Sequence, residues 1–430
     1  MDNNNKPFTS TLGSGGCPFG HGSQPSNSNS NDEANTTPTA TTGDTDIKES
    51  IKKASLMEPS MEVNKVHTGV YYGSYLKIDE LLKLQEPESL KQGEGKEAHE
   101  EHLFIIIHQT YELWFKQIIH ELDSIRSMMS SVPTPERHNG VIVNRLGRIV
   151  QIEKLLVDQI SILETMTGLD FLEFRNLLVP ASGFQSVQFR VIENKLGIIP
   201  DNRVQYQQHH YQTFFSDTDR ESLAQSEKDT SLLGLVVNWL ERNPFLKVGE
   251  YDFWQSYSAA VDQILQRDLE RIKNNQSLTE DIKEQNIKEV EKNMNSFKTL
   301  FDENLYNAKL EKHEVRLSYK ALQSALLIYL YKDEPIFHTP FLILNLLTEI
   351  DELLQMWRFR HGLMVQRIIG AKIGTGGSSG YHYLRTTIGD RYKIFLDLFN
   401  LSSYLIPRNT LPQLPKVVSQ QMDFVWGNQN

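Results

Sequence analysis

The sequence predicts an all-α protein, and three observations lead to that fold class. Apolar residues recur at three- and four-residue spacing over long segments, which is the period of a helix. Alternation of apolar and polar residues, the pattern of a half-buried strand, is scarce. The chain of 430 residues shows no internal repeat, so we expect one large helical domain over 55–430 with a small charged helical-hairpin insertion at 251–310.

The first segment, residues 1 to about 45, is rich in Asn, Ser, Thr and Gly and nearly lacks large apolar residues. We expect a disordered tail, because such a segment buries too little surface to offset the entropy lost on ordering. The tail holds the pair Cys17-Pro18. A Cys-Pro pair can act as a haem-responsive thiolate, and the alternative is a plain tail.

The predicted helices then follow in order. Residues 99–102 read His-Glu-Glu-His, which lacks the zincin spacing and indicates a solvated helix start. Segment 100–130 is apolar on nearly every face in its first half, which predicts a buried helix. Segment 141–168 repeats apolar residues at helical spacing, and segment 251–310 is highly charged, which is typical of a solvated hairpin. Further amphipathic or buried helices are expected at 314–330, 340–369 and 386–404.

Composition excludes several classes of protein. The formal net charge of −11 argues against a nucleic-acid partner, since phosphate binding needs a basic surface. No run of roughly 18 apolar residues occurs, so we expect no membrane span. The N-terminus lacks a secretory signal pattern. Cys17 is the one cysteine, which excludes an intrachain disulfide, Cys-rich zinc sites and covalent haem attachment through C-x-x-C-H. A cytoplasmic protein fits these features.

His361 is the first candidate for chemistry. It follows Trp357 by four residues, so both side chains share a helix face, and bulky apolar residues surround them. No second His, Cys or carboxylate lies nearby at zinc-ligand spacing, whereas a haem that uses O2 needs one proximal imidazole and an open distal position. A satisfied core histidine is the alternative.

His108 ends the apolar run that begins at Phe104, and the two residues are i, i+4 neighbours that face one cavity. Burial disfavours the imidazolium, so a neutral His108 could accept a hydrogen bond from a substrate N–H. The alternative is a histidine hydrogen-bonded to a backbone carbonyl.

Arg175 follows Phe171 by four residues and is flanked by apolar side chains, so we expect a partly buried guanidinium. Such a group needs an anion, and a carboxylate bound by two hydrogen bonds is the best match. The alternative is an internal salt bridge with Asp170 or Glu173. The small residues at 180–184, Ser182 among them, break the helix and allow a flat ligand to approach.

The glycine-rich loop at 374–380 follows a helix and lacks the lysine of a phosphate-binding P-loop. It predicts a lid, with Thr375 as the polar side chain that could touch a covered ligand. A Tyr-Gly-x-Tyr turn at the start of the ordered chain, Tyr72 to Tyr75, suggests an arm that packs on a neighbouring molecule or caps its own core.

These blocks together resemble the tryptophan 2,3-dioxygenase family. The resemblance is carried by YGSYLKIDELL, EEHLFIIIHQTYELWFKQI, LETMTGLDFLEFRNLL with the following PASGFQSVQFR, WRFRH and GTGGSSGYHYLR, and it spans about residues 70–410. Indoleamine 2,3-dioxygenases share the chemistry but lack this distal histidine context and the Tyr-Gly-x-Tyr arm.

The resemblance implies a helical enzyme with one haem b per subunit, built as a homotetramer, a dimer of dimers. Its expected substrates are L-tryptophan and O2, and its product is N-formyl-L-kynurenine. By the resemblance, His361 is the proximal iron ligand beside Trp357, and His108 accepts the indole N–H. The remaining implied contacts to substrate come from Phe104, Phe171, Arg175, Ser182, Thr375 and, reaching from the neighbouring subunit, Tyr72, Tyr75 and Leu76.

Within that pattern, Arg175 grips the substrate carboxylate, Thr375 meets its ammonium end and Ser182 lies near the O2 side. Some relatives carry a Tyr at the position of Phe171, and Phe171 cannot make the extra carboxylate hydrogen bond of that Tyr. Two other functions stay open at this point: a haem or tryptophan sensor without turnover, and the same reaction on an indole that lacks the carboxylate. Arg175 argues against the second.

Overall fold

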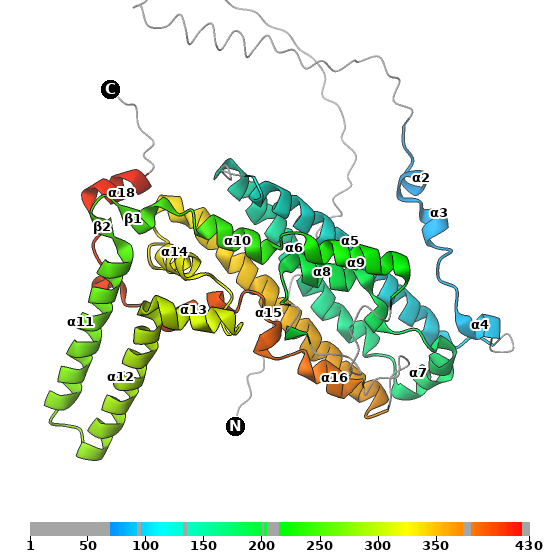
Figure 1. Ribbon diagram of the computed structural model, residues 1–430. Coiled ribbons are helices and arrows are strands. Elements are labelled where there is room, and N and C mark those ends of the chain that lie inside the picture. The colour runs from blue at the N-terminus through cyan, green and yellow to red at the C-terminus, as the bar shows by residue number, and fades with distance from the viewer. Residues whose placement is uncertain are drawn as a thin grey trace, which may run out of the picture. The chain divides into compact units, whose positions relative to one another are not determined.

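The computed structural model describes residues 69–92, 96–131, 136–199, 202–203, 215–372 and 380–423 (Figure 1). The chain falls into two units, Met1–Tyr75 and Leu76–Asn430. In the described part nearly all regular structure is helical, so the all-α prediction is confirmed. The described strands are β1 (Lys247–Val248) and β2 (Tyr251–Asp252), which pair antiparallel. The predicted tail, with Cys17, lies outside the described residues.

The helices follow one another with short connections. Those of the first half are α2 (Tyr72–Leu76), α3 (Ile78–Leu81), α4 (Glu88–Gln92), α5 (His99–Met129), α6 (Asn139–Leu163), α7 (Gly168–Phe174), α8 (Val187–Leu196), α9 (Asp217–Lys228) and α10 (Leu232–Leu240). Those of the second half are α11 (Phe253–Asn274), α12 (Glu280–Phe301), α13 (Glu303–Glu311), α14 (Tyr319–Leu330), α15 (Pro335–Ile369), α16 (Tyr381–Thr386), α17 (Leu396–Asn400) and α18 (Lys416–Met422).

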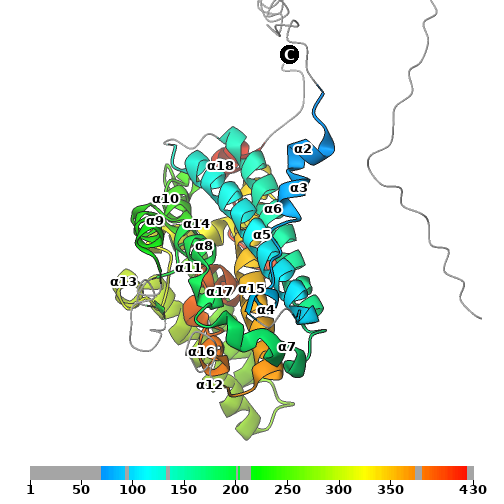
Figure 2. The same ribbon diagram turned by 90° about the vertical axis from the view of Figure 1, so that its right-hand side faces the viewer.

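Three long helices, α5, α6 and α15, form the centre of the second unit (Figures 1 and 2). Helix α6 packs along both α5 and α15, and α8 packs on α5. Their shared core contains fully buried side chains such as Leu122, Ile149 and Leu347. Each such side chain stabilises the fold by about 1.5–3 kcal/mol relative to its exposed state. The centre therefore provides rigid walls on which side chains for chemistry can stand.

Two details of α5 differ from the prediction. Its first half is not buried on all faces, because Ile106 and Leu113 are exposed. Its start is not fully solvated either, because Glu101 is buried and accepts hydrogen bonds from the backbone N–H groups of Glu88 (2.8 Å) and Ser89 (2.9 Å). A carboxylate that satisfies the free N–H groups at the start of α4 fixes that helix against α5.

The predicted charged hairpin is present as α11 and α12 (Figure 1). In α12 Leu300 is the one buried residue, and i, i+3 and i, i+4 ion pairs such as Lys283–Glu280 and Lys288–Glu284 lie on its surface. A helix with so little burial depends on its partner α11 for stability. We propose that 251–310 is an insertion into the domain formed by 55–430.

The prediction of one helix over 386–404 is wrong. Helix α16 ends at Thr386, a 3₁₀ turn η7 (Asp390–Tyr392) follows, and α17 is short. A distant carboxylate takes a backbone bond that a helix would use, because Asp351 on α15 accepts from the N–H of Phe395 (2.8 Å). Tertiary hydrogen bonds have thus overridden local helix propensity. No described helix combines the length and the apolar character needed to cross a bilayer.

Candidate active site

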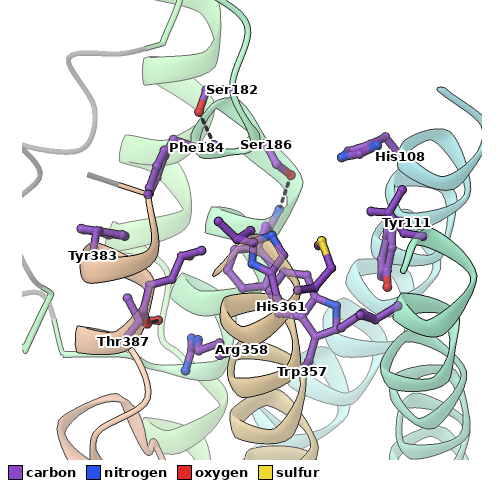
Figure 3. A pocket seen from close by; sticks show the side chains of 18 of the residues that line it. His108, Tyr111, Ser182, Phe184, Ser186, Trp357, Arg358, His361, Tyr383 and Thr387 are labelled. Carbon is purple, nitrogen blue, oxygen red and sulfur yellow. Dashed lines mark hydrogen bonds between the residues drawn. The ribbon is translucent and has the colours of Figure 1, made fainter. Parts of the chain in front are cut away.

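A cavity of about 300 Å³ opens between α5, α7, α8, α15 and α16, and most of its surface is apolar (Figure 3). Six residues predicted from the sequence line it: Phe104, His108, Phe171, Ser182, Trp357 and His361. They come from chain segments up to 257 positions apart, 361 minus 104. The fold therefore gathers these predicted residues around one space.

His361 stands on α15 in the middle of the cavity wall (Figure 3). Its ring stacks on that of Trp357, with 5.1 Å between centroids and 16° between planes, as i, i+4 neighbours on a helix can. Among the described residues the imidazole makes no hydrogen bond. Burial is the main cause that lowers its pKa to about 4, and His108 adds a smaller contribution. The ring is therefore neutral at pH 7 and can offer a nitrogen lone pair.

His108 stands on α5 and faces the same cavity (Figure 3). Its Nδ1 lies 2.7 Å from the carbonyl oxygen of Phe104. A carbonyl only accepts, so Nδ1 carries the proton and Nε2 keeps its lone pair. Burial lowers the pKa of His108, which keeps the ring neutral. The alternative of a carbonyl-bonded histidine is thus correct for Nδ1, and the same bond prepares Nε2 as an acceptor.

An aromatic group closes the end of the cavity beside His108. The Phe104 ring lies 4.0 Å from the His108 ring, 5.7 Å from Phe171 and 5.5 Å from Phe174. Helix α7 carries both of the latter and approaches α15 closely at Gly168. A Cβ there would lie 2.6 Å from the carbonyl oxygen of Ile368, so a larger residue would push α7 away.

Ser182 and Arg175 lie in the segment after α7. Ser182 lines the cavity. Its hydroxyl oxygen accepts from the N–H of Phe184 (3.4 Å), and the side-chain oxygen of Gln185 accepts from the N–H of Ser182 (3.1 Å). These two bonds together cap the 3₁₀ turn η3 (Gly183–Gln185). Arg175 begins the 3₁₀ turn η2 (Arg175–Leu178) and is half-buried, as expected, but it is not among the residues that line the cavity.

The Asp170 alternative for Arg175 receives little support from the structure. The Asp170 carboxylate instead accepts from the N–H (2.8 Å) and the hydroxyl (2.6 Å) of Thr167 at the start of α7. Thr375 lies outside the described residues, together with 373–379. Tyr72 and Tyr75 stand on the short helix α2, and they and Leu76 are exposed.

The sequence reasoning missed a charged group at another side of the cavity. Arg190 and Glu193 on α8, Arg358 on α15 and Tyr383 on α16 all line it. Glu193 is 1% exposed and accepts from Arg190 (2.8 Å) and Arg358 (2.7 Å). Burial raises its pKa, but Arg190, Arg203 and Arg358 together outweigh burial and lower it to about 2.

A signal for this group was present in the sequence. Arg190 and Glu193 are i, i+3 neighbours, and Arg358 lies three residues before His361, between the large apolar residues Trp357 and Phe359. A charged residue on the apolar face of a helix needs a buried partner. The partner could not be identified because it lies 165 positions away, at Glu193.

The cavity thus combines two neutral imidazoles with a mostly apolar wall. One imidazole presents an acceptor nitrogen, and the other makes no hydrogen bond that would occupy its lone pair. Apolar walls exclude water and strengthen the few polar contacts that remain. Such a site suits a flat, largely apolar ligand with an N–H group, together with a cofactor that one imidazole can ligate.

Comparison with known proteins agrees with this description of the cavity. The family model described as tryptophan 2,3-dioxygenase matches residues 57–405. A protein of Dictyostelium discoideum named tryptophan 2,3-dioxygenase is 76% identical over 380 residues, covering 88% of this chain and 94% of that protein. Proteins of the same name from Xenopus tropicalis (49% over 347 residues; 80% and 84% covered) and Anopheles gambiae (47% over 363 residues; 84% and 91% covered) are also similar. The chain belongs to the tryptophan 2,3-dioxygenase family.

Proposed function

We propose that this protein is a haem-dependent dioxygenase that opens the indole ring of L-tryptophan, the first step of tryptophan breakdown by the kynurenine pathway. Both atoms of O2 are added at C2 and C3, the C2–C3 bond breaks, and N-formyl-L-kynurenine forms. The observation that carries this proposal is the pair of neutral imidazoles, His108 and His361, in one apolar cavity of a chain that belongs to this family.

The cavity fits haem b by the chemistry of its lining. His361 stands in the cavity wall, is neutral and makes no hydrogen bond to another described residue, so its imidazole would hold the iron of a bound haem. The flat Trp357 ring holds the imidazole plane in place. Bound haem supplies an iron centre at which O2 binds and is activated. We assign His361 as the proximal ligand and one haem b to each subunit.

The side chains around the substrate have separate tasks in this proposal. The Nε2 lone pair of His108 accepts the indole N–H, and Phe104 stacks against the indole ring. Arg175 binds the carboxylate with Phe171 alongside, and Thr375 meets the ammonium end. Ser182 lies near the O2 side. The apolar wall would exclude water from the reacting groups.

The assembly in this proposal is a cytoplasmic homotetramer, a dimer of dimers. The arm with Tyr72, Tyr75 and Leu76 then reaches the active site of the neighbouring subunit. Its exposed apolar side chains, which include Val70 and Tyr71 as well, support an intermolecular contact, because a soluble protein rarely leaves such a segment bare.

The test is a single-turnover and steady-state assay of the ferrous, haem-loaded protein with L-tryptophan and ¹⁸O2. We expect N-formyl-L-kynurenine that carries two labelled oxygen atoms, measured by mass spectrometry. The absence of product at full haem loading would contradict a dioxygenase and favour a sensor without turnover. A product with one labelled atom would indicate a different oxidation.

A further inference from the structure

The two sides of the cavity differ in polarity. Phe104, Phe171, Leu163 and Met364 make one side apolar. On another side stand Arg190, Arg358, Tyr383 and Thr387, and Figure 3 shows the last three away from His108 and Tyr111. A ligand that fills this space should itself have an apolar edge and a charged edge.

Among the described carboxylates, Glu193 pairs directly with both arginines that line the cavity, Arg190 and Arg358. Its carboxylate accepts from Arg190 at 2.8 Å and from Arg358 at 2.7 Å, and Arg203 approaches it at 3.5 Å. Arg203 also lies 3.8 Å from Glu227. Within the part of the chain that the structure describes, two guanidinium groups share one carboxylate, which leaves about one positive charge without a direct counter-ion. A buried excess of positive charge costs free energy unless an anion binds beside it.

The other acidic groups near Arg358 do not supply the missing counter-ion. Asp351 and Glu153 both act on Arg358 electrostatically, but neither forms an ion pair with it within 4 Å among the described residues. Burial raises the pKa of Glu153 well above its usual value, which favours its neutral form. Tyr383 also lines the cavity, and burial raises the pKa of its phenol to about 12.

We propose that Arg190 and Arg358, oriented by Glu193 and assisted by Tyr383, form a carboxylate-binding subsite that holds a propionate arm of the haem. This inference rests on the proposed function. A guanidinium fork matches a carboxylate in two hydrogen bonds, and Arg358 lies less than one helical turn before His361 on α15. Haem b has an apolar edge and an opposite edge with two propionates, which matches the two sides of the cavity.

The test compares haem b with its dimethyl ester, which lacks both carboxylates. We expect Arg190→Gln to release haem b to apomyoglobin roughly 10-fold faster than wild type, since one charge-assisted hydrogen bond is lost. With the dimethyl ester, wild type and variant should release at the same rate. Arg408→Gln is the matched control, because Arg408 is 72% exposed in a surface pair with Asp333.

Three outcomes decide the inference. Equal acceleration for haem b and its ester would overturn it, because the effect would not depend on a carboxylate. Unchanged haem release, with calorimetric affinity lost for L-tryptophan but not for tryptamine, would overturn the haem assignment and make the same subsite one for the substrate carboxylate. No change with any of these ligands would overturn the subsite itself.

A second variant separates binding from folding. Tyr383→Phe removes one hydroxyl and leaves the ring against Phe184, whose centroid lies 4.8 Å away. We expect a smaller acceleration of haem b release, about 3-fold, and none with the ester. If wild type binds no haem, the proposed function fails, and the tryptophan and tryptamine titrations still show whether these arginines bind a carboxylate.

Discussion

The α15 wall and the α5 wall of the cavity each present a neutral histidine, but the two are held differently. On α15, His361 is fixed by ring stacking on Trp357 and makes no hydrogen bond among the described residues. On α5, His108 is fixed by a 2.7 Å hydrogen bond to the carbonyl of Phe104. Buried charged side chains accompany both helices: Glu101 and Glu121 stand on α5, and Asp351 and Arg358 stand on α15.

This difference teaches how one cavity can assign separate roles to the same residue type. A histidine that already donates through Nδ1 to its own helix has a fixed tautomer and a fixed direction for Nε2. That arrangement suits a hydrogen-bond acceptor for substrate. A histidine that is held by stacking alone keeps its ring nitrogens available, and it suits a metal ligand. Substitutions in each wall test whether the two histidines have these separate roles.

The largest effect is expected at the α15 wall. His361→Ala should abolish haem retention, because it removes the proposed axial ligand. The measurement is the haem content and Soret spectrum of purified protein, reconstituted with haem under identical conditions. The matched control is His338→Ala, which removes an exposed histidine from the same helix and should leave the spectrum unchanged. A normal Soret spectrum in His361→Ala would show that another group ligates the iron.

A smaller effect is expected at the α5 wall. His108→Ala should retain haem and lower kcat/KM for L-tryptophan about 10-fold, because a buried hydrogen bond to the indole N–H is lost. With 1-methyl-L-tryptophan, which has no indole N–H, the variant and wild type should differ little. An equal loss on both substrates would mean that His108 acts through shape rather than through its acceptor nitrogen.

The sequence could predict those parts of the fold that depend on local patterns, and it could not predict those that depend on contacts between distant residues. Helices α5, α6 and α15 were predictable because each repeats an apolar face over many turns. The break of 386–404 was not, because long-range contacts accompany it: Asp351 accepts from the N–H of Phe395, and the Asp397 side chain accepts from the backbone of Arg316 and Leu317. Those contacts join residues 44 to 81 positions apart, and no local pattern records them.

For the candidate site the limit has the same origin. His108 and His361 were conspicuous as single polar residues in apolar helices, and the cavity contains both. Arg190, Glu193 and Arg358 were passed over because charged residues in an amphipathic helix usually face solvent. Only the packing of α8 near α15 buries them as one group. Their roles, like those of the predicted site residues, remain proposals.

The last comparison concerns two buried glutamates near α15 with opposite pKa shifts. Arginines hold the pKa of Glu193 at about 2, whereas burial holds that of Glu153 well above its usual value, and neither Glu153 oxygen has a hydrogen-bond partner among the described residues. Glu193→Gln should therefore lower the free energy of unfolding at pH 7 by about 3 kcal/mol, because it removes the anion of a buried pair. Glu153→Gln should change it by less than about 1 kcal/mol at pH 5, since glutamine resembles the protonated acid.

The sign of the pH dependence separates the two. A lowered folded-state pKa means that Glu193 contributes stability above about pH 4.5, which is lost as the pH falls towards 2. A raised folded-state pKa means that Glu153 costs stability as the pH rises above about 4.5. Urea unfolding at pH 5 and pH 8 should show that Glu153→Gln gains stability relative to wild type at the higher pH. If it instead loses stability at pH 8, Glu153 is ionised in the folded protein and balances the charge of Arg358. The excess positive charge that supports the carboxylate subsite would then be absent.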